Sequence, residues 1–337
     1  MKFKNLLIFL FGSSLLLFFT TCKEEELPIK VLRFEQDLLN PNLANSPVHY
    51  QSLRAKYPLF FESYCKDMLG LDPNEGATNF IRPLSGFIQY PGTVLLKHEV
   101  DSVFPNLNAF ELELGKAMQV YKKEFRSEPI PQFVSYISEF SYAHVTYDSL
   151  VGIGLDFYLG ENYALYKAPS IEFPDFMVRK LRREYMLTNT LKAFAIGKFE
   201  SQLTDKRLLA LMLFEGKIKY FIKTLAPNLP DSILFGYTTQ QLKWCEENES
   251  MIWKHLASTN LLFSKDGAQF MRYINDGPFT IAESVPQESA PSIAIYSGYK
   301  IIEKFVEEEG VDSLKELMDN NKWDEILKKS SYKPTLN

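Results

Sequence analysis

The chain has 337 residues, of which 37 are lysine or arginine and 42 are aspartate or glutamate, and its formal net charge is −5 at pH 7. An acidic chain without a basic stripe is not expected to bind nucleic acid. Hydrophobic residues make up 46% of the chain and aromatic residues 14%, which excludes a disordered linker and allows a large hydrophobic core.

The N-terminus carries a targeting signal that ends at a cysteine. Lys2 and Lys4 precede an apolar run over residues 6–19, which closes on Thr20-Thr21-Cys22. The run is shorter than the roughly 20 apolar residues that a membrane span needs. The arrangement resembles a bacterial lipoprotein signal, which predicts that residues 1–21 are a signal peptide and that Cys22 carries the lipid, such as palmitate.

Two alternatives to lipidation stay open, because the residues before Cys22 depart from the usual pattern. Phe19 and Thr21 stand where Leu and a Gly, Ala or Ser are usual. The segment could instead be an uncleaved membrane anchor, or an ordinary signal peptide with a coincidental cysteine. Lipidation would place the protein in the cell envelope, and we expect it at the outer membrane, facing the periplasm or the cell surface.

Residues 22–30 are predicted to be a tether between the lipid and the folded part. Glu24, Glu25 and Glu26 follow the cysteine almost directly. Such acidic residues resemble a surface-export tag, and they fit a solvated tether equally well.

The first half of the folded part is predicted to contain helices and then a small sheet. Helices are expected over residues 31–39, in pieces over 50–69, and over 107–126, where apolar residues recur at helical spacing. Residues 133–137 and 150–158 are rich in β-formers, with a strand or turn expected over 141–147. We predict a small antiparallel sheet there. Gly152 and Gly154 indicate a bulge or a close approach of the backbone.

The second half is predicted to be helical. Helices are expected over residues 175–194, 205–225, 239–258, 292–309 and 311–328. No repeat or Gly/Ser/Pro-rich linker divides the chain. The prediction is therefore one mainly helical α+β domain over residues 31–337.

Few residues offer recognisable chemistry. Cys65 and Cys245 either form a disulfide or are small buried side chains. His98-Glu99 begins like a zinc-protease helix, but Ser102 stands where the second histidine would be. A zinc site of that kind needs imidazoles at i and i+4, so a surface His–Glu pair is expected.

Two glutamates are arranged as in a metallopeptidase that has lost its metal. In gluzincin-like proteases a sheet precedes a His-Glu-x-x-His helix, and a later helix supplies a third ligand from a glutamate. Glu184 and Glu215 fit that order, but Arg183 and Leu187 occupy the two ligand positions, and neither can ligate zinc. We therefore expect no metal, no cofactor and no catalytic residue, with Glu184 and Glu215 as vestigial candidates. Ordinary glutamates on helix surfaces are the alternative.

Two further charged features each have a structural and a functional explanation. The charged residues over 179–184 are expected to form a solvated helix face, with an ion pair between Lys180 and Glu184. A docking surface for an anionic partner is the other possibility. Asp156 lies in an apolar segment, so it is either hydrogen-bonded inside the fold or part of a site.

A set of short segments spans nearly the whole mature chain. Its parts are residues 153–160 with Tyr163 and Tyr166, residues 215–221, 236–238 and 241–249 with Trp253, and residues 277–280, 297–302 and 331–334. Together they resemble the gliding motility lipoprotein GldB family of the Bacteroidetes. One departure lies at residues 290–295, where the resemblance implies a Ser-Pro-Gly-Arg-like turn followed by a tryptophan before the glycine of the next helix. This chain has neither, so a pocket there is expected to differ.

The resemblance implies a lipoprotein that takes part in gliding and in the associated protein secretion, with protein partners and no established enzymatic activity. It also implies a distant relation to zincin-type peptidases, and hence a zincin-like fold. The leading hypothesis is a membrane-anchored, non-catalytic accessory protein. The alternatives are a zinc-dependent peptidase and a surface lipoprotein that binds a peptide or glycan.

Overall fold

The computed structural model describes residues 27–147, 149–258, 260–282 and 285–335. The predicted signal peptide, Cys22 and the start of the predicted tether lie outside these residues. In this part of the chain, no helix has the length and apolar character needed to cross a membrane.

A four-stranded mixed sheet lies in the first half of the molecule. Its strands are β1 (Val31–Arg33), β2 (Gln132–Tyr136), β3 (His144–Tyr147) and β4 (Leu150–Gly154), in the order β1-β2-β4-β3. β2 is parallel to both β1 and β4, and β3 and β4 form an antiparallel hairpin. The sheet is therefore mixed: the predicted antiparallel pairing holds for β3 and β4 but is wrong for β2 and β4, and β1 also pairs in parallel. Val31 pairs with Phe133, a contact about a hundred residues apart that no local pattern encodes.

The glycines of β4 allow the close packing that the sequence predicted. A Cβ atom on Gly152 would lie 2.6 Å from Val145 Cγ2, and one on Gly154 would lie 2.5 Å from the Tyr142 carbonyl oxygen. Both distances are too short for a real side chain, so the predicted close approach is confirmed.

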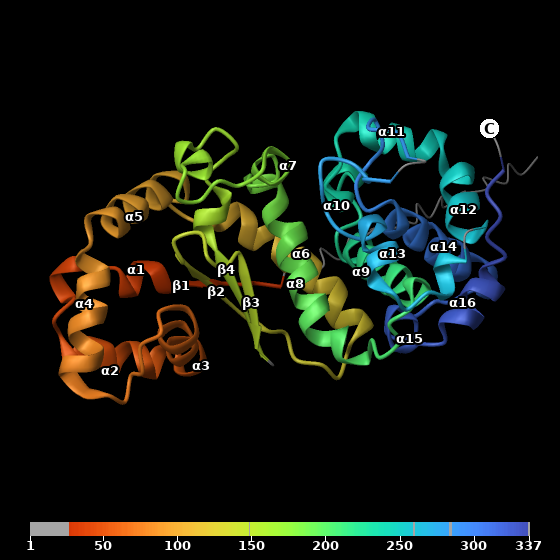
Figure 1. The fold of residues 1–337 in the computed structure, drawn as a ribbon. Helices are drawn as coiled ribbons and strands as arrows, with labels where there is room; N and C mark the ends of the chain where they lie inside the picture. The colour runs from red at the N-terminus through yellow and green to blue at the C-terminus, as the bar shows by residue number, and fades with distance from the viewer. Residues whose placement is uncertain (1–26, 148, 259, 283–284, 336–337) are drawn as a thin grey trace, which may run out of the picture.

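Short helices of the N-terminal part lie on one side of the sheet, at the left of Figure 1. They are α1 (Phe34–Leu38), α2 (Pro47–Lys56), α3 (Pro58–Ser63), α4 (Arg82–Gln89) and α5 (Pro91–Val103). Pro47, Pro58 and Pro91 each start a helix, a position where the missing N–H costs nothing. The predicted helix over 31–39 begins instead as β1, because those residues pair with β2.

The remaining helices form the middle and the C-terminal part of the molecule (Figure 1). They are α6 (Asn108–Glu124), α7 (Asp175–Val178), α8 (Met186–Phe199), α9 (Leu208–Leu225), α10 (Asp231–Phe235), α11 (Thr239–Glu247), α12 (Glu249–Ser258), α13 (Gly267–Phe270), α14 (Ile293–Glu309), α15 (Leu314–Asp319) and α16 (Trp323–Ser330). The predicted helices over 107–126, 205–225 and 292–309 are confirmed. Those over 239–258 and 311–328 are each divided in two. α11 starts with a capping box between Thr238 and Gln241.

The single helix predicted over 175–194 is wrong. α7 ends at Val178, and α8 begins only at Met186. Between them, Arg179 donates to the Gly236 carbonyl, Lys180 pairs with Asp276, and Arg183 donates to the Val103 carbonyl. These partners lie on separate segments of the chain. Lys180 therefore pairs with a distant residue and not with Glu184 as expected, and Glu184 is exposed.

Helices α9 and α14 form the centre of the C-terminal part. A Cβ atom on Gly298 of α14 would overlap the Met212 carbonyl oxygen of α9, and one on Gly216 would lie 2.5 Å from the Gly298 carbonyl carbon. The two backbones therefore touch at these glycines. The molecule is a mainly helical α+β domain, as predicted, whereas its zincin-like character stays a prediction.

Candidate functional site

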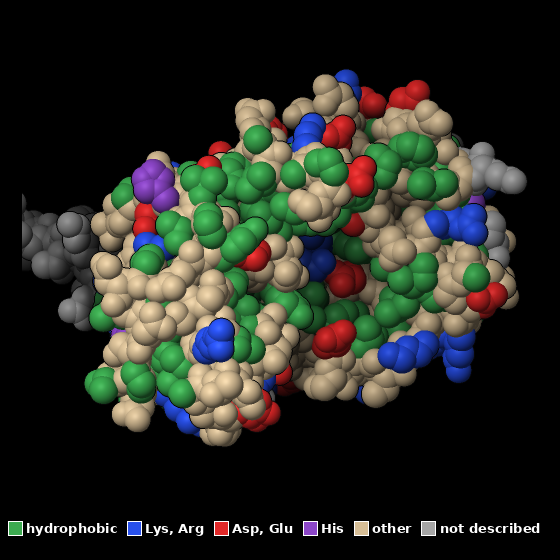
Figure 2. Space-filling view, turned by 60° about the vertical axis from the view of Figure 1, so that its left-hand side comes forward, with side chains coloured by type: hydrophobic (Ala, Val, Ile, Leu, Met, Phe, Trp, Pro, Cys, Tyr) green, Lys and Arg blue, Asp and Glu red, His purple; other side chains and the backbone are tan. Residues whose placement is uncertain are grey.

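The face of the molecule shown in Figure 2 is hollowed near its centre, where acidic and basic side chains lie among apolar ones. One cavity in the described part of the chain gathers five charged side chains. It has a volume of about 440 Å³ and lies against α8, α9, α10 and the start of α14. We call it the lysine pocket, and its lining residues are Met177, Lys180, Leu181, Tyr185, Thr188, Asn189, Lys192, Glu215, Lys219, residues 233–237, residues 274–276, Ser292 and Ile295.

Two of its three lysines have carboxylate partners. Lys180, in the turn between α7 and α8, forms an ion pair with Asp276, and burial lowers the pKa of Lys180. Lys192 of α8 lies 3.6 Å from Glu215 Oε2 of α9, which is too long for a hydrogen bond.

Lys219 is different, because it is buried without a carboxylate partner in the described structure. Its side chain belongs to α9, and its Nζ donates to the Leu234 carbonyl at 2.6 Å and lies 5.8 Å from the centre of the Phe235 ring. An ammonium group has three donors, so one acceptor leaves it incompletely satisfied. Burial accordingly lowers the pKa of Lys219 to about 7.

The start of α14 completes the wall of the pocket. Ser292, which precedes this 17-residue helix, has a left-handed backbone with φ of 53°. Glycine adopts that conformation readily, which explains why the family resemblance implies a Gly after Pro291. The Ser292 hydroxyl donates to the Asn275 carbonyl and does not cap the helix.

Glu215 and Glu184, the two vestigial candidates, line different cavities. Glu215 belongs to the lysine pocket, whereas Glu184 lines a second cavity of about 480 Å³ with Phe104, Glu113 and Arg183. Glu184 also precedes α8, in a 3-10 turn, so it does not stand inside a helix as in a His-Glu-x-x-His motif.

The residues at the expected ligand positions make other contacts. Arg183 stacks its guanidinium 4.9 Å from the centre of the Phe104 ring, and Leu187 is buried in the core. The described residues also contain no group of three or more His, Cys, Asp or Glu side chains that could hold a metal ion. These side chains do not fit a zinc ion.

Asp156 is hydrogen-bonded inside the fold, which is the first of the two alternatives expected from the sequence. It is fully buried, and its Oδ2 accepts hydrogen bonds from the backbone N–H groups of Ser138 and Phe140 at 3.2 and 2.7 Å. Glu139 and Phe140 both have positive φ angles. The carboxyl group therefore holds a left-handed turn against the sheet, and burial raises its pKa to about 7.

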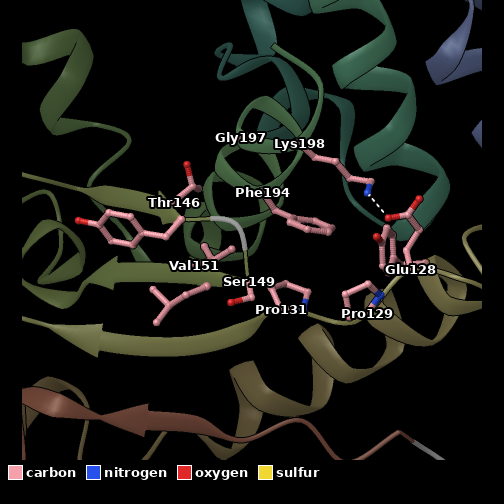
Figure 3. Close-up of a pocket in the computed structure, with 12 residues that line it drawn as sticks. Glu128, Pro129, Pro131, Thr146, Ser149, Val151, Phe194, Gly197 and Lys198 are labelled. Atoms are coloured by element: carbon pink, nitrogen blue, oxygen red, sulfur yellow. Dashed lines mark hydrogen bonds and ion pairs between the residues drawn. The ribbon is translucent and has the colours of Figure 1, made fainter. Parts of the chain in front are cut away.

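A third cavity, shown in Figure 3, lies beside the β3–β4 hairpin. It has a volume of about 310 Å³, and an ion pair of 2.7 Å joins Lys198 of α8 to Glu128. Since this lysine has a carboxylate partner, the cavity offers a comparison for Lys219.

Cys65, Cys245 and the His98-Glu99 pair were the other candidates from the sequence. Cys65 and Cys245 are free and buried, so they do not form a disulfide here. His98 is exposed, and Glu99 accepts a hydrogen bond from Tyr163.

Sequence analysis singled out Glu215 but missed Lys219, Thr188 and Asp276. One signal was present, because Lys217 and Lys219 stand in a helix that is otherwise almost entirely apolar. Long charged side chains in such a helix are buried or lie at a cavity.

The fold and its pockets define a mainly helical α+β protein with a charged pocket, and Arg183 and Leu187 stand where a zinc peptidase would have ligands. The model of the family described as gliding motility protein GldB matches residues 20–334 of the chain, so the chain belongs to the gliding motility protein GldB family. The family model is named GldB_lipo, which implies a lipoprotein of the cell envelope and agrees with the signal at Cys22. No curated protein and no solved structure matches the chain significantly.

Proposed function

We propose that this chain is a non-catalytic accessory component of the gliding machinery and of the protein secretion apparatus associated with it. A lipid on Cys22 anchors it to the outer membrane, and residues 22–30 tether a folded domain over residues 31–337. The observation that carries the proposal is the family match over residues 20–334, which is nearly the whole chain.

The non-catalytic part of the proposal is supported by the side chains themselves. Arg183 and Leu187 stand at the positions where a zinc peptidase has ligands, and Glu184 and Glu215 line separate cavities. Neither an arginine side chain nor a leucine side chain binds zinc. The domain therefore acts by holding partner proteins at the membrane.

The anchoring is tested by replacing Cys22 with serine in cells and separating membrane from soluble proteins. A diacylated or triacylated cysteine binds a membrane firmly, so we expect Cys22→Ser to lose palmitate labelling and to leave the membrane fraction. Cys245→Ala, at a buried cysteine, is the matched control and should stay membrane-bound. Full membrane retention of Cys22→Ser would favour an uncleaved anchor.

The accessory role is tested by metal analysis and by crosslinking. Purified protein should contain no stoichiometric zinc, and zinc bound at one ion per chain that disappears in Glu215→Gln would overturn the non-catalytic role. Crosslinking in gliding cells, followed by mass spectrometry, should recover components of the motility or secretion apparatus, and recovery of none would count against the proposal.

A further inference from the structure

Lys219 is the one lysine of the lysine pocket for which the described residues provide no carboxylate partner. Its side chain is 8% exposed, and Nζ donates to a single carbonyl, that of Leu234. Buried charges in proteins are normally paired, because removing an unpaired charge from water is costly. A lysine at a cavity wall that still has hydrogen-bond donors to offer can bind an anion in that cavity.

A second, independent observation lies on the neighbouring helix. Thr188 of α8 lines the same pocket and is 3% exposed, yet within the described part of the chain its hydroxyl has no hydrogen-bond partner. A buried hydroxyl without a hydrogen-bond partner destabilises the fold. A ligand oxygen in the pocket would supply that partner.

The helix that starts at the pocket adds a favourable electrostatic field. Ser292 and Ile295 of the first turn of α14 line the pocket, and no side chain caps this 17-residue helix. The N-terminus of a helix carries a partial positive charge and free N–H groups, which favour anions. The three lysines exceed the two carboxylates, Glu215 and Asp276, so the net charge of the pocket is positive when Lys219 is protonated.

Part of the lining is apolar and suits the body of a small organic molecule, beside polar side chains such as Asn189 and Asn275. Leu181, Phe235, Ile274 and Ile295 lie on its walls, and its volume of about 440 Å³ is within the range of small-molecule sites. We propose that the lysine pocket binds a small organic anion, a carboxylate or a phosphate monoester joined to an apolar group, through Lys219, Thr188 and the start of α14.

The proposal goes beyond the accessory role and is tested on detergent-solubilised full-length protein by titration calorimetry. The probes are phenylacetate, phenyl phosphate and inorganic phosphate, with neutral phenylacetamide as the control ligand. We expect phenylacetate or phenyl phosphate to bind more tightly than phenylacetamide and to raise the melting temperature. Tighter binding of phenylacetate would identify the ligand class as a carboxylate, and tighter binding of phenyl phosphate would identify it as a phosphate monoester. Weaker binding of inorganic phosphate than of phenyl phosphate would show that the apolar group contributes to affinity. Equal or weaker binding than phenylacetamide by every anion would overturn the proposal.

Variants locate the site. Lys219→Met should weaken anion binding about tenfold or more, because a hydrogen bond from a charged donor is lost. Thr188→Val, which keeps the side-chain shape, should weaken it severalfold. Lys198→Met, at the paired lysine of the cavity in Figure 3, should leave the affinity unchanged. Unchanged affinity in Lys219→Met, or an equal loss in Lys198→Met, would contradict the assignment.

The pH dependence gives a second readout. Lys180, Lys192, Glu215 and Asp276 are the charged groups that face Lys219 from the surrounding segments. Since burial lowers the pKa of Lys219 to about 7, phenylacetate affinity should fall as the pH rises from 6 to 9. Lys219→Met should remove most of that fall. A pH dependence that is the same in the variant would show that Lys219 does not hold the anion.

Discussion

Asp156 is a buried acid. Among the described residues, two backbone N–H groups of the 138–140 turn donate hydrogen bonds to its carboxylate. Burial raises its pKa from about 3.8 to about 7, so the folded protein binds a proton that the unfolded chain releases. The stabilising effect of that proton is complete below about pH 3.8 and is lost as the pH rises to about 7.

We therefore expect Asp156→Asn to change how stability depends on pH. The asparagine oxygen can accept both N–H bonds without a charge. Relative to the variant, the natural protein should lose about 3 kcal/mol of unfolding free energy between pH 5 and pH 8. Urea unfolding of both proteins at the two pH values measures this difference. Parallel pH profiles would mean that Asp156 does not titrate in this range.

Lys217 and Lys219 are two residues apart on α9 but are satisfied differently. Lys217 Nζ lies 2.9 Å from the carbonyl oxygens of Met318 and Asn320 and 3.3 Å from that of Leu317, and it stands 4.7 Å from the centre of the Trp323 ring. All three of its donors can thus be used at the end of α15. Lys217 is a structural cation, whereas Lys219 is not fully satisfied by the fold.

Replacing each lysine with methionine should separate these roles. Lys217→Met should lower the free energy of unfolding by about 3 kcal/mol, because buried carbonyls lose their donor. Lys219→Met should change it by about 1 kcal/mol or less, because the loss of one hydrogen bond is offset by removal of a poorly paired buried charge. Chemical denaturation measures both, and a larger loss in Lys219→Met would show that the fold depends on that cation.

At the scale of elements, the contact between α9 and α14 depends on two glycines. Gly216 and Gly298 both belong to segments that carry the family resemblance. Their missing side chains let the two backbones touch, so glycine at these two positions serves packing.

Gly298→Ala should destabilise the protein by about 3 kcal/mol, because the added methyl group overlaps the Met212 backbone and forces the helices apart. Gly86→Ala is the matched control, since Gly86 lies in α4 with nothing within 4 Å of an added Cβ. There the better helix propensity of alanine should stabilise the protein by up to about 1 kcal/mol. Thermal unfolding of both variants should show shifts of opposite sign, and equal shifts would refute the packing argument.

At the scale of the whole molecule, one aromatic cluster joins the middle of the chain to its C-terminal helices. The rings are Tyr121 of α6, Phe125 just after α6, Phe194 and Phe199 of α8, and Phe221 of α9. Their centres lie 4.8 to 6.4 Å apart in their contacts. Glu124 of α6 also accepts a hydrogen bond from the backbone N–H of Leu314. These contacts predict that the parts unfold together.

Urea unfolding should therefore show one transition by two probes. The three tryptophans, at positions 244, 253 and 323, report on the C-terminal part, whereas far-ultraviolet circular dichroism reports on all helices. The two curves should coincide. Phe221→Ala should move both to lower urea by the same amount, equivalent to about 4 kcal/mol. Separate midpoints would mean that the C-terminal helices form an independent domain.

Several features were predictable from local sequence because their causes are local. The helices over 107–126, 205–225 and 292–309 follow from the spacing of their apolar residues, and the start of α11 follows from its Thr238–Gln241 cap. Glu215 was found because its spacing from Glu184 suggested a metallopeptidase order. Lys219 was not found, because the number of hydrogen-bond acceptors around a lysine is known only once the tertiary structure shows its neighbours.

By itself, the sequence determined the α+β class and the family, and it predicts a signal that ends at Cys22, since each depends on residues close together or on the order of motifs. The tertiary structure decided the parallel pairing of β1 with β2 and the break between α7 and α8. It also decided the separation of Glu184 from Glu215 and the environment of Lys219. These features depend on which distant groups meet, and burial then sets whether a charged group is paired, shifted in pKa or left available to a ligand.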